Sequence, residues 1–209
     1  MSKIKNIIFD LDGTLWDSRL QIIEAWKESV PNLVLDKEQL NDLMGKTQNA
    51  FIHYLFPNCD HHKAQELMHK CELAEVDYLG KHGANLYNGV LETIQKLSLK
   101  YKLFIVSNCQ CGYVESFLNY YNLNDYFSDH ICSGDTKLSK PENIAAIMKA
   151  NNLEQSNTCY VGDTTSDYSA AQYNNIFFIW TCYGFGKDIN CKYILKDFQN
   201  IENVIESIK

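Results

Sequence analysis

The sequence predicts an α/β fold, a doubly wound parallel β-sheet whose first strand is followed by an inserted bundle of four helices. Along most of the chain, short apolar runs alternate with amphipathic stretches, as in buried parallel strands joined by crossover helices. From about residue 18 to 82, in contrast, the periodicity is helical throughout. An α/β core interrupted once by helices accounts for both patterns.

The first strand is predicted at Ile7-Ile8-Phe9, directly before Asp10-Leu11-Asp12-Gly13-Thr14. Asp10 and Asp12 fall just beyond the carboxyl end of this strand, where open α/β sheets bind ligands. Because side chains two apart on a strand share a face, both carboxylates are expected to face one pocket. They repel by roughly 4 kcal/mol at an effective dielectric of about 20, so we expect a cation, a shared proton or one carboxylate turned away.

The inserted segment contains residues that commonly begin and end helices. The first helix carries an apolar stripe of Leu20, Ile23 and Trp26. The other three are expected to begin at polar capping residues, namely Asp36 (with Gln39 as a capping-box partner), Thr47 and Asp60. We therefore expect residues 17–83 to form a helical bundle inserted into a core of residues 1–16 and 84–209.

The rest of the chain is predicted to complete the sheet. Further strands are expected at 102–106, near Ile131, and at 158–161, 176–180 and 193–195. Helices are expected near 89–99 and 112–122, after Lys140, and after Asp197. Right-handed crossovers between these strands would place the ligand site at the carboxyl edge of the sheet.

Three further segments bring groups that can bind phosphate or metal to this edge. The strand at 102–106 ends in Ser107-Asn108, and the strand at 158–161 ends in the segment Gly162–Asp167. Ser139-Lys140-Pro141 opens a helix, with Pro141 at a tolerated first-turn position. Together with Asp10–Thr14, these segments resemble the four motifs of the haloacid dehalogenase superfamily, whose members are mostly phosphatases with a Rossmann-like core.

The helical insert resembles the C1-type cap that follows the first strand in this superfamily. Together with Tyr87-Asn88-Gly89-Val90, it makes the chain similar to the phosphoglycolate phosphatase-like members. That group acts on phosphoglycolate, pyrophosphate, nucleoside monophosphates and sugar phosphates, and the sequence does not choose among these substrates.

The resemblance implies a catalytic role for three residues. Asp10 would be the nucleophile that forms an aspartyl-phosphate intermediate. Asp12 would protonate the leaving group and then accept a proton from the hydrolytic water. Lys140 would bind the phosphate and neutralise charge in the transition state.

The same resemblance implies a phosphate site and a Mg²⁺ site. Ser107 would donate its hydroxyl to the phosphate beside the backbone amide of Asn108. Asp10, Asp163 and the backbone carbonyl of Asp12 would bind Mg²⁺, which suits oxygen ligands. Asp167 would hold a metal-bound water or orient Lys140.

Charge counting also favours a cation. Four aspartates against Lys140 alone would repel a phosphate monoester, whereas one divalent cation and a proton on Asp12 bring the site close to neutral. Each residue has a simpler alternative, however. Ser107-Asn108 could be an ordinary turn, Lys140 a solvated lysine, and Asp163 a helix cap with Asp167 facing solvent. Asp17 and Ser18 are interpreted as N-cap residues of the first inserted helix.

Specificity is expected on the loop Gly45-Lys46-Thr47-Gln48 of the insert. Lys46 could meet a second anionic group of the substrate or be a solvated lysine. A set of histidines and cysteines (His53, Cys59, His61, His62, His69 and Cys71) could suggest zinc, but its spacing fits helix-surface histidines better.

Alternative activities on the same fold are distinguished by single positions. Haloacid dehalogenases lack the second acidic residue of the first motif, so Asp12 argues against that chemistry. Mutases resembling β-phosphoglucomutase carry an arginine where this chain has Gln48, and phosphonate-cleaving relatives use a cap lysine, for which Lys46 is the candidate. A non-catalytic binding protein would have lost Asp10, Asp12 or Asp163, and all three are present.

Composition limits the remaining possibilities. The 209 residues suffice for a substantial core, and a net charge of −7 argues against nucleic-acid or anionic-membrane partners. Apolar runs are too short for a membrane span or an export signal. Several of the eight cysteines lie in or beside apolar strands, so we expect a cytoplasmic protein with reduced thiols that acts on a small phosphorylated metabolite. The sequence leaves the oligomeric state open.

Overall fold

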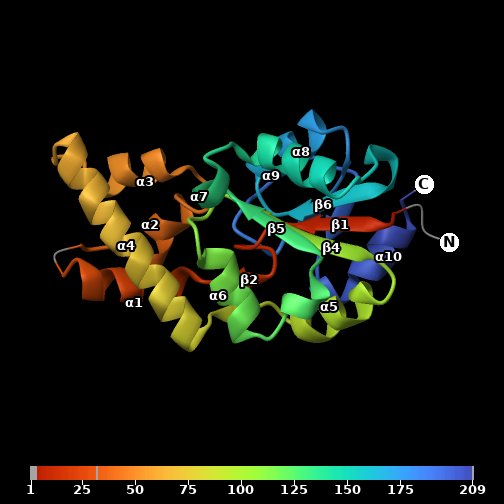
Figure 1. Cartoon of the computed structure of the whole chain (residues 1–209), viewed down its shortest axis with the longest axis horizontal. Helices are drawn as coiled ribbons and strands as arrows, with labels where there is room; N and C mark the ends of the chain where they lie inside the picture. Colours follow the sequence, from red (N-terminus) through yellow and green to blue (C-terminus); the bar gives the residue numbers. More distant parts are fainter. Residues whose placement is uncertain (1–3, 32, 209) are drawn as a thin grey trace.

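The computed structural model describes residues 4–31 and 33–208, and its centre is a six-stranded parallel sheet (Figure 1). The strands are β1 (Asn6–Phe9), β4 (Lys102–Ser107), β5 (Asp129–Cys132), β6 (Thr158–Gly162), β7 (Phe177–Thr181) and β8 (Tyr193–Leu195). Their order across the sheet is β5-β4-β1-β6-β7-β8, and each neighbouring pair is parallel. The predicted α/β fold class is therefore confirmed.

Helices cover both faces of this sheet. α8 (Lys140–Ala150) and α9 (Thr165–Tyr173) lie on one face, and α5 (Val90–Ser98), α6 (Tyr113–Tyr120) and α10 (Ile201–Glu206) lie on the other (Figure 1). Alternation along β1 explains the two layers, because Ile8 packs in the α8–α9 core whereas Ile7 and Phe9 pack in the opposite one. All three side chains are fully buried, as expected for a central parallel strand.

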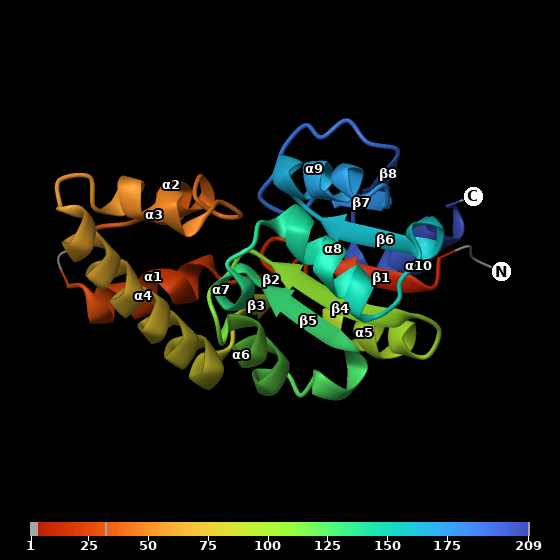
Figure 2. The ribbon, with the colours of Figure 1, turned by 45° about the horizontal axis from the view of Figure 1, so that its top comes forward.

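Four helices follow the first strand and gather beside the carboxyl edge of the sheet (Figure 2). They are α1 (Arg19–Ser29), α2 (Lys37–Asn41), α3 (Gln48–Leu55) and α4 (His61–His82). They share a hydrophobic cluster of their own, in which Trp26, Leu40 and Met68 are buried. All four helices lie within residues 17–83, the segment for which the helical insert is predicted.

A short antiparallel ribbon joins the insert to the core. β2 (Trp16–Asp17) pairs with β3 (Asn85–Leu86), so the chain enters and leaves the helices at the same place. Gly83 ends α4 with a φ of 64°, a left-handed backbone that glycine adopts without steric cost. The segment between β5 and α8 adds the short helix α7 (Ser133–Thr136).

The capping residues begin the helices where the sequence predicts them. Asp36 and Gln39 form a reciprocal capping box, and the Asp60 side chain accepts the Lys63 amide hydrogen. Thr47 precedes α3 as predicted, but its side chain makes no capping hydrogen bond. Leu20 does not lie on the buried stripe of α1, because its side chain is 46% exposed and Ile22, Ala25 and Trp26 carry the packing instead.

No helix among the described residues combines the length and the apolar character that crossing a membrane would require.

Candidate active site

The carboxyl ends of three neighbouring strands bring the predicted residues together. Asp10 follows β1, Ser107 ends β4 and Asp163 follows β6, and β1 lies between the other two strands. A cavity of about 770 Å³ opens over this edge between the core and the inserted helices. Its lining includes predicted site residues from both parts of the chain, namely Asp10, Asp12, Ser107, Asn108 and Lys140 from the core, and Lys46 and Gln48 from the insert.

Lys140 lies at the centre of a buried ion-pair network. Its Nζ is 2.9 Å from Asp10 Oδ1 and 2.6 Å from Asp167 Oδ1, and the side chain is 2% exposed. Burial alone would favour a neutral amine, but attraction from the two carboxylates raises the pKa of Lys140 well above its ordinary value. The alternative of a solvated lysine is therefore wrong.

Both carboxylate oxygens of Asp167 accept hydrogen bonds. Oδ1 accepts from Lys140, whereas Oδ2 accepts from the Thr164 amide at 2.8 Å and the Thr164 hydroxyl at 2.7 Å. The residue is completely buried, so the alternative in which it faces solvent is wrong. This arrangement places the Asp167 carboxylate directly against the Lys140 ammonium.

Asp163 keeps one carboxylate oxygen free. Oδ2 accepts from the Phe185 amide at 2.7 Å, whereas Oδ1 is buried and has no hydrogen-bond partner in the described structure. Burial, with a further contribution from the charge of Asp167, raises the pKa of Asp163 to about 7. A buried carboxylate oxygen without a donor is costly unless a cation binds it.

The carboxylates fit a hard divalent cation. One oxygen from each of Asp10, Asp163 and Asp167 can be chosen so that the three atoms lie within 4.8 Å of one another. Burial raises the pKa of Asp10, and although Lys140 opposes this effect, Asp167 and Asp163 add to it. An all-oxygen set with one unpartnered ligand atom suits a hard divalent cation.

Glycines make room for this carboxylate cluster. A Cβ on Gly13 would lie 2.3 Å from Asp163 Oδ2, and its φ of +80° also disfavours any other residue. A Cβ on Gly184 would lie 2.4 Å from the Asp163 Cβ. The Asp163 carboxylate is therefore held against backbone on two sides.

The Asp12 carboxylate is not part of this group of three carboxylates and is held by three donors. Its Oδ1 accepts from Trp16 Nε1 and the Tyr113 hydroxyl, each at 2.8 Å, and from the Ser18 hydroxyl. Burial raises the pKa of Asp12 to about 6, and the three hydrogen bonds oppose this shift. A carboxyl group with a pKa near 6 is suited to giving and accepting a proton.

The structure corrects the interpretation of Asp17 and Ser18. Ser18 stands at the N-cap position of α1, but its hydroxyl makes no capping bond and donates to Asp12 instead. Asp17 forms an ion pair with Arg19 at 2.7 Å. Sequence reasoning also missed Trp16 and Tyr113, whose only signal is their type, since their contact with Asp12 depends on the tertiary fold.

Ser107 is buried, and Asn108, which follows it, is half-buried and contacts the insert. The Ser107 hydroxyl accepts from the Cys109 amide at 3.4 Å, and its side chain is 4% exposed. The Asn108 side-chain amide donates to the Gly45 carbonyl at 3.0 Å, so this residue ties the core to the loop before α3. The prediction for Asn108 concerned its backbone amide and did not include this link.

The predicted specificity residues lie on the wall of the cavity. Lys46 and Gln48 are exposed, and the Gln48 side-chain amide donates to Glu72 on α4. The histidines of the inserted helices are exposed, and the acidic cluster at Asp10 is the metal-competent group found among residues 4–31 and 33–208. The eight cysteines are free thiols.

The buried carboxylates and the lysine at the carboxyl edge of the parallel sheet lie where the haloacid dehalogenase-like motifs of the sequence place them. Residues 7–181 match the family model for haloacid dehalogenase-like hydrolases. The chain belongs to this family, as its motifs predict.

Individual relatives cover most or nearly all of the chain. A phosphoglycolate phosphatase of Photobacterium profundum is 29% identical over 97% of this chain and 96% of its own. Pyrophosphatase PpaX of Bacillus cereus is 25% identical over 81% of this chain and 79% of its own. The crystal structure of a predicted phosphatase from Clostridium acetobutylicum superposes with a TM-score of 0.80 at 26% identity, covering 98% of this chain and 99% of that one.

Proposed function

We propose that the protein is a Mg²⁺-dependent phosphatase that hydrolyses a small phosphorylated metabolite through an aspartyl-phosphate on Asp10. The buried Asp10–Lys140–Asp167 network beside the unpartnered oxygen of Asp163 carries this proposal. The phosphatase names of the sequence relatives support the same reaction.

In this proposal, Asp10 attacks phosphorus and displaces the alcohol of the ester. Lys140 binds one Asp10 oxygen, which orients the carboxylate and leaves its other oxygen for the attack. Asp12 donates its proton to the leaving oxygen and then accepts a proton from the water that hydrolyses the acyl phosphate.

The phosphate and metal sites complete the reaction centre. The Ser107 hydroxyl and the Asn108 amide would donate to phosphate oxygens, and Lys140 would balance their charge. Asp10, Asp163 and the Asp12 carbonyl would hold Mg²⁺, with Asp167 acting through Lys140. When bound, the cation neutralises charge on the phosphoryl oxygens.

The inserted helices would act as a cap over this centre. We propose the division into a core of 1–16 and 84–209 and a cap of 17–83, with β2 and β3 as the connection. A cap that closes on the cavity would exclude water and contact the leaving group. The free thiols support a cytoplasmic location.

The test is phosphate release from a panel of phosphate monoesters with and without Mg²⁺. Asp10→Asn is expected to lower kcat by more than about a thousandfold, because the amide cannot form the acyl phosphate. Asp77→Asn, an exposed site on α4, is the matched control and is expected to keep full activity. Turnover by Asp10→Asn comparable to the native protein would contradict the assignment of the nucleophile.

A further inference from the structure

The cap side of the cavity combines aromatic and aliphatic side chains with two carboxylates. Trp26 on α1 and Phe51 on α3 meet edge to face with ring centroids 6.0 Å apart. Glu72 and Glu75 lie one turn apart on α4 and line the same cavity. The mechanism proposed above uses none of these four side chains.

Glu75 is a buried carboxylate without a counter-charge. It is 5% exposed, and its Oε2 accepts from Trp26 Nε1 at 2.9 Å. Its polar neighbours Trp26 and Gln110 are neutral, and the charges acting on it, Asp12 and Glu72, are negative. Burial accordingly raises the pKa of Glu75 to about 8.

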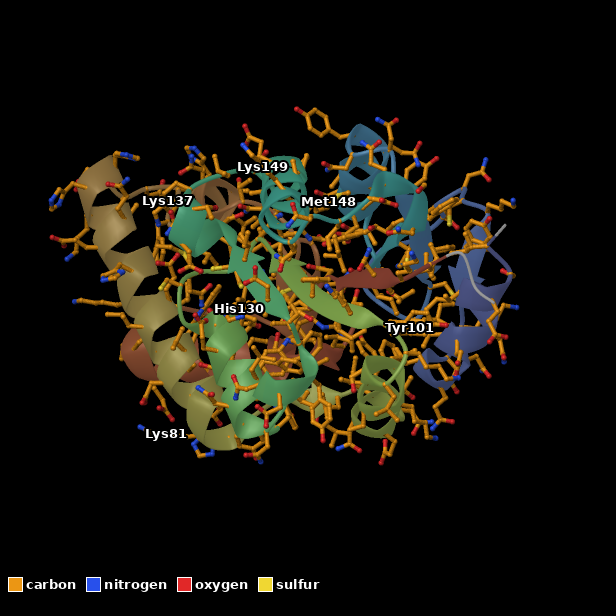
Figure 3. All side chains as sticks on the ribbon, turned by 45° about the vertical axis from the view of Figure 1, so that its right-hand side comes forward. Lys81, Tyr101, His130, Lys137, Met148 and Lys149 are labelled. Carbon is orange, nitrogen blue, oxygen red and sulfur yellow. The ribbon has the colours of Figure 1, made fainter. Side chains whose placement is uncertain are left out.

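The cations of the cavity lie elsewhere. Lys140 is bound to Asp10 and Asp167, whereas Lys46 and Lys137 are exposed. Lys137 lies at the end of α7, on the side of the core that faces the inserted helices (Figure 3). His69 is also exposed, and its Nδ1 is 3.8 Å from Glu72.

A second anionic group of the substrate would therefore find no buried positive charge beside Glu75. A carboxylate placed against the buried part of the cap would approach Glu75 and keep that side chain from ionising, and the described residues offer no buried cation there to bind the carboxylate. An ammonium group, in contrast, would supply the positive counter-charge that ionised Glu75 lacks. The same group could lie against the faces of Trp26 or Phe51. A neutral group would leave Glu75 protonated and would form no ion pair with it.

Taking the phosphatase function as given, we propose that the cavity selects phosphate monoesters of amino alcohols, whose ammonium group binds Glu75 against the aromatic wall of Trp26 and Phe51. The cavity of about 770 Å³ has room for such a leaving group beside the phosphate site. The proposal sets this chain apart from the relative named for phosphoglycolate, whose leaving group carries a carboxylate.

Binding of non-hydrolysable analogues tests this preference independently of turnover. Calorimetry in Mg²⁺ would compare 2-aminoethylphosphonate with propylphosphonate, which has the same number of heavy atoms and no charge on its tail. We expect the native protein to bind the amine at least about tenfold more tightly, a difference of about 1.4 kcal/mol. Equal affinity, or tighter binding of propylphosphonate or phosphonoacetate, would overturn the proposal.

Substitution of Glu75 tests whether this side chain causes the preference for the amine. Glu75→Gln keeps the shape and can still accept from Trp26, and it is expected to reduce the affinity ratio to about one. Glu66→Gln, on an exposed site of the same helix, is the matched control and should retain the native ratio. An unchanged ratio of amine to propylphosphonate affinity in a folded Glu75→Gln protein would overturn the role of Glu75. If that variant does not fold, the affinity ratio of the native protein decides whether the amine is preferred.

The proposed function and this inference fail in different ways. If Mg²⁺-dependent turnover is found but the amine is not preferred, the substrate class is wrong and the phosphatase stands. If the amine is preferred in binding but no monoester is hydrolysed, the reaction is wrong and the amine subsite stands.

Discussion

At the scale of single residues, Lys140 compensates two buried carboxylates that would otherwise repel each other. Asp10 and Asp167 each lie within 2.9 Å of its Nζ, and all three side chains are almost inaccessible to water. Removing one partner from a buried ion pair leaves an uncompensated charge, which is the costly way to break such a pair. Lys140 therefore contributes to stability as well as to the proposed chemistry.

The prediction concerns Lys140→Met. We expect the free energy of unfolding of the metal-free protein at pH 7 to fall by about 3 kcal/mol, because Asp10 and Asp167 lose their counter-charge. Urea unfolding followed by circular dichroism measures this change, and phosphate release should be lost as well. Lys149→Met, on the exposed side of α8, is the control and should change the free energy by less than about 0.5 kcal/mol. A similar small effect of Lys140→Met would show that the network is not stabilising.

The sequence predicts the charged residues of the site better than their neutral partners. Asp10, Lys140 and Asp163 stand directly at strand ends or a helix start, so local pattern places them. Tyr113 reaches Asp12 from 101 positions further along the chain, and only the packing of α6 reveals that contact. The Ser18 hydroxyl, similarly, has a local capping role available and instead donates to Asp12.

At the scale of elements, α4 buries a titratable group in the middle of an otherwise amphipathic helix. Burial raises the pKa of Glu75 from the ordinary 4.5 to about 8. The unfolded chain therefore releases the Glu75 proton above about pH 4.5, whereas the folded chain keeps it until about pH 8. The folded state binds more protons in this window, so Glu75 lowers stability progressively as the pH rises.

The prediction is that Glu75→Gln removes this pH dependence. Relative to the native protein, the variant should gain about 3 kcal/mol of unfolding free energy between about pH 5 and pH 8. Urea unfolding at several pH values measures the difference between the two proteins. A constant difference across this range would mean that Glu75 titrates at its ordinary pKa in the folded protein.

Helix boundaries are predicted well where a cap is local. Asp36 and Asp60 accept amide hydrogens three residues ahead, and this spacing is visible in the sequence. The buried face of α1 is predicted less well, because Leu20 is exposed although it belongs to the apolar pattern. Which side of a helix is buried depends on its neighbours, and α1 packs mainly against α4.

At the scale of the whole molecule, the alternation of strands and helices in the sequence predicts the fold. It does not predict which side chains line the cavity. Parallel strands must end at one edge, so the sequence predicts that Asp10, Ser107 and Asp163 converge. The composition of the cap wall depends on how α4 is rotated above that edge. Glu72 and Glu75 were not predicted as site residues because this rotation is set by packing of the inserted helices and by the contact of α4 with α6.

The most direct test of the proposed reaction is to trap the covalent intermediate. A reaction with Mg²⁺ and a hydrolysed monoester would be acid-quenched within the first turnover and treated with borohydride, which reduces an aspartyl-phosphate to homoserine. Mass spectrometry of the peptide that contains Asp10 should then show homoserine at that position, and samples without substrate should not. Phosphate release without reduction at Asp10, or reduction at another aspartate, would contradict the account.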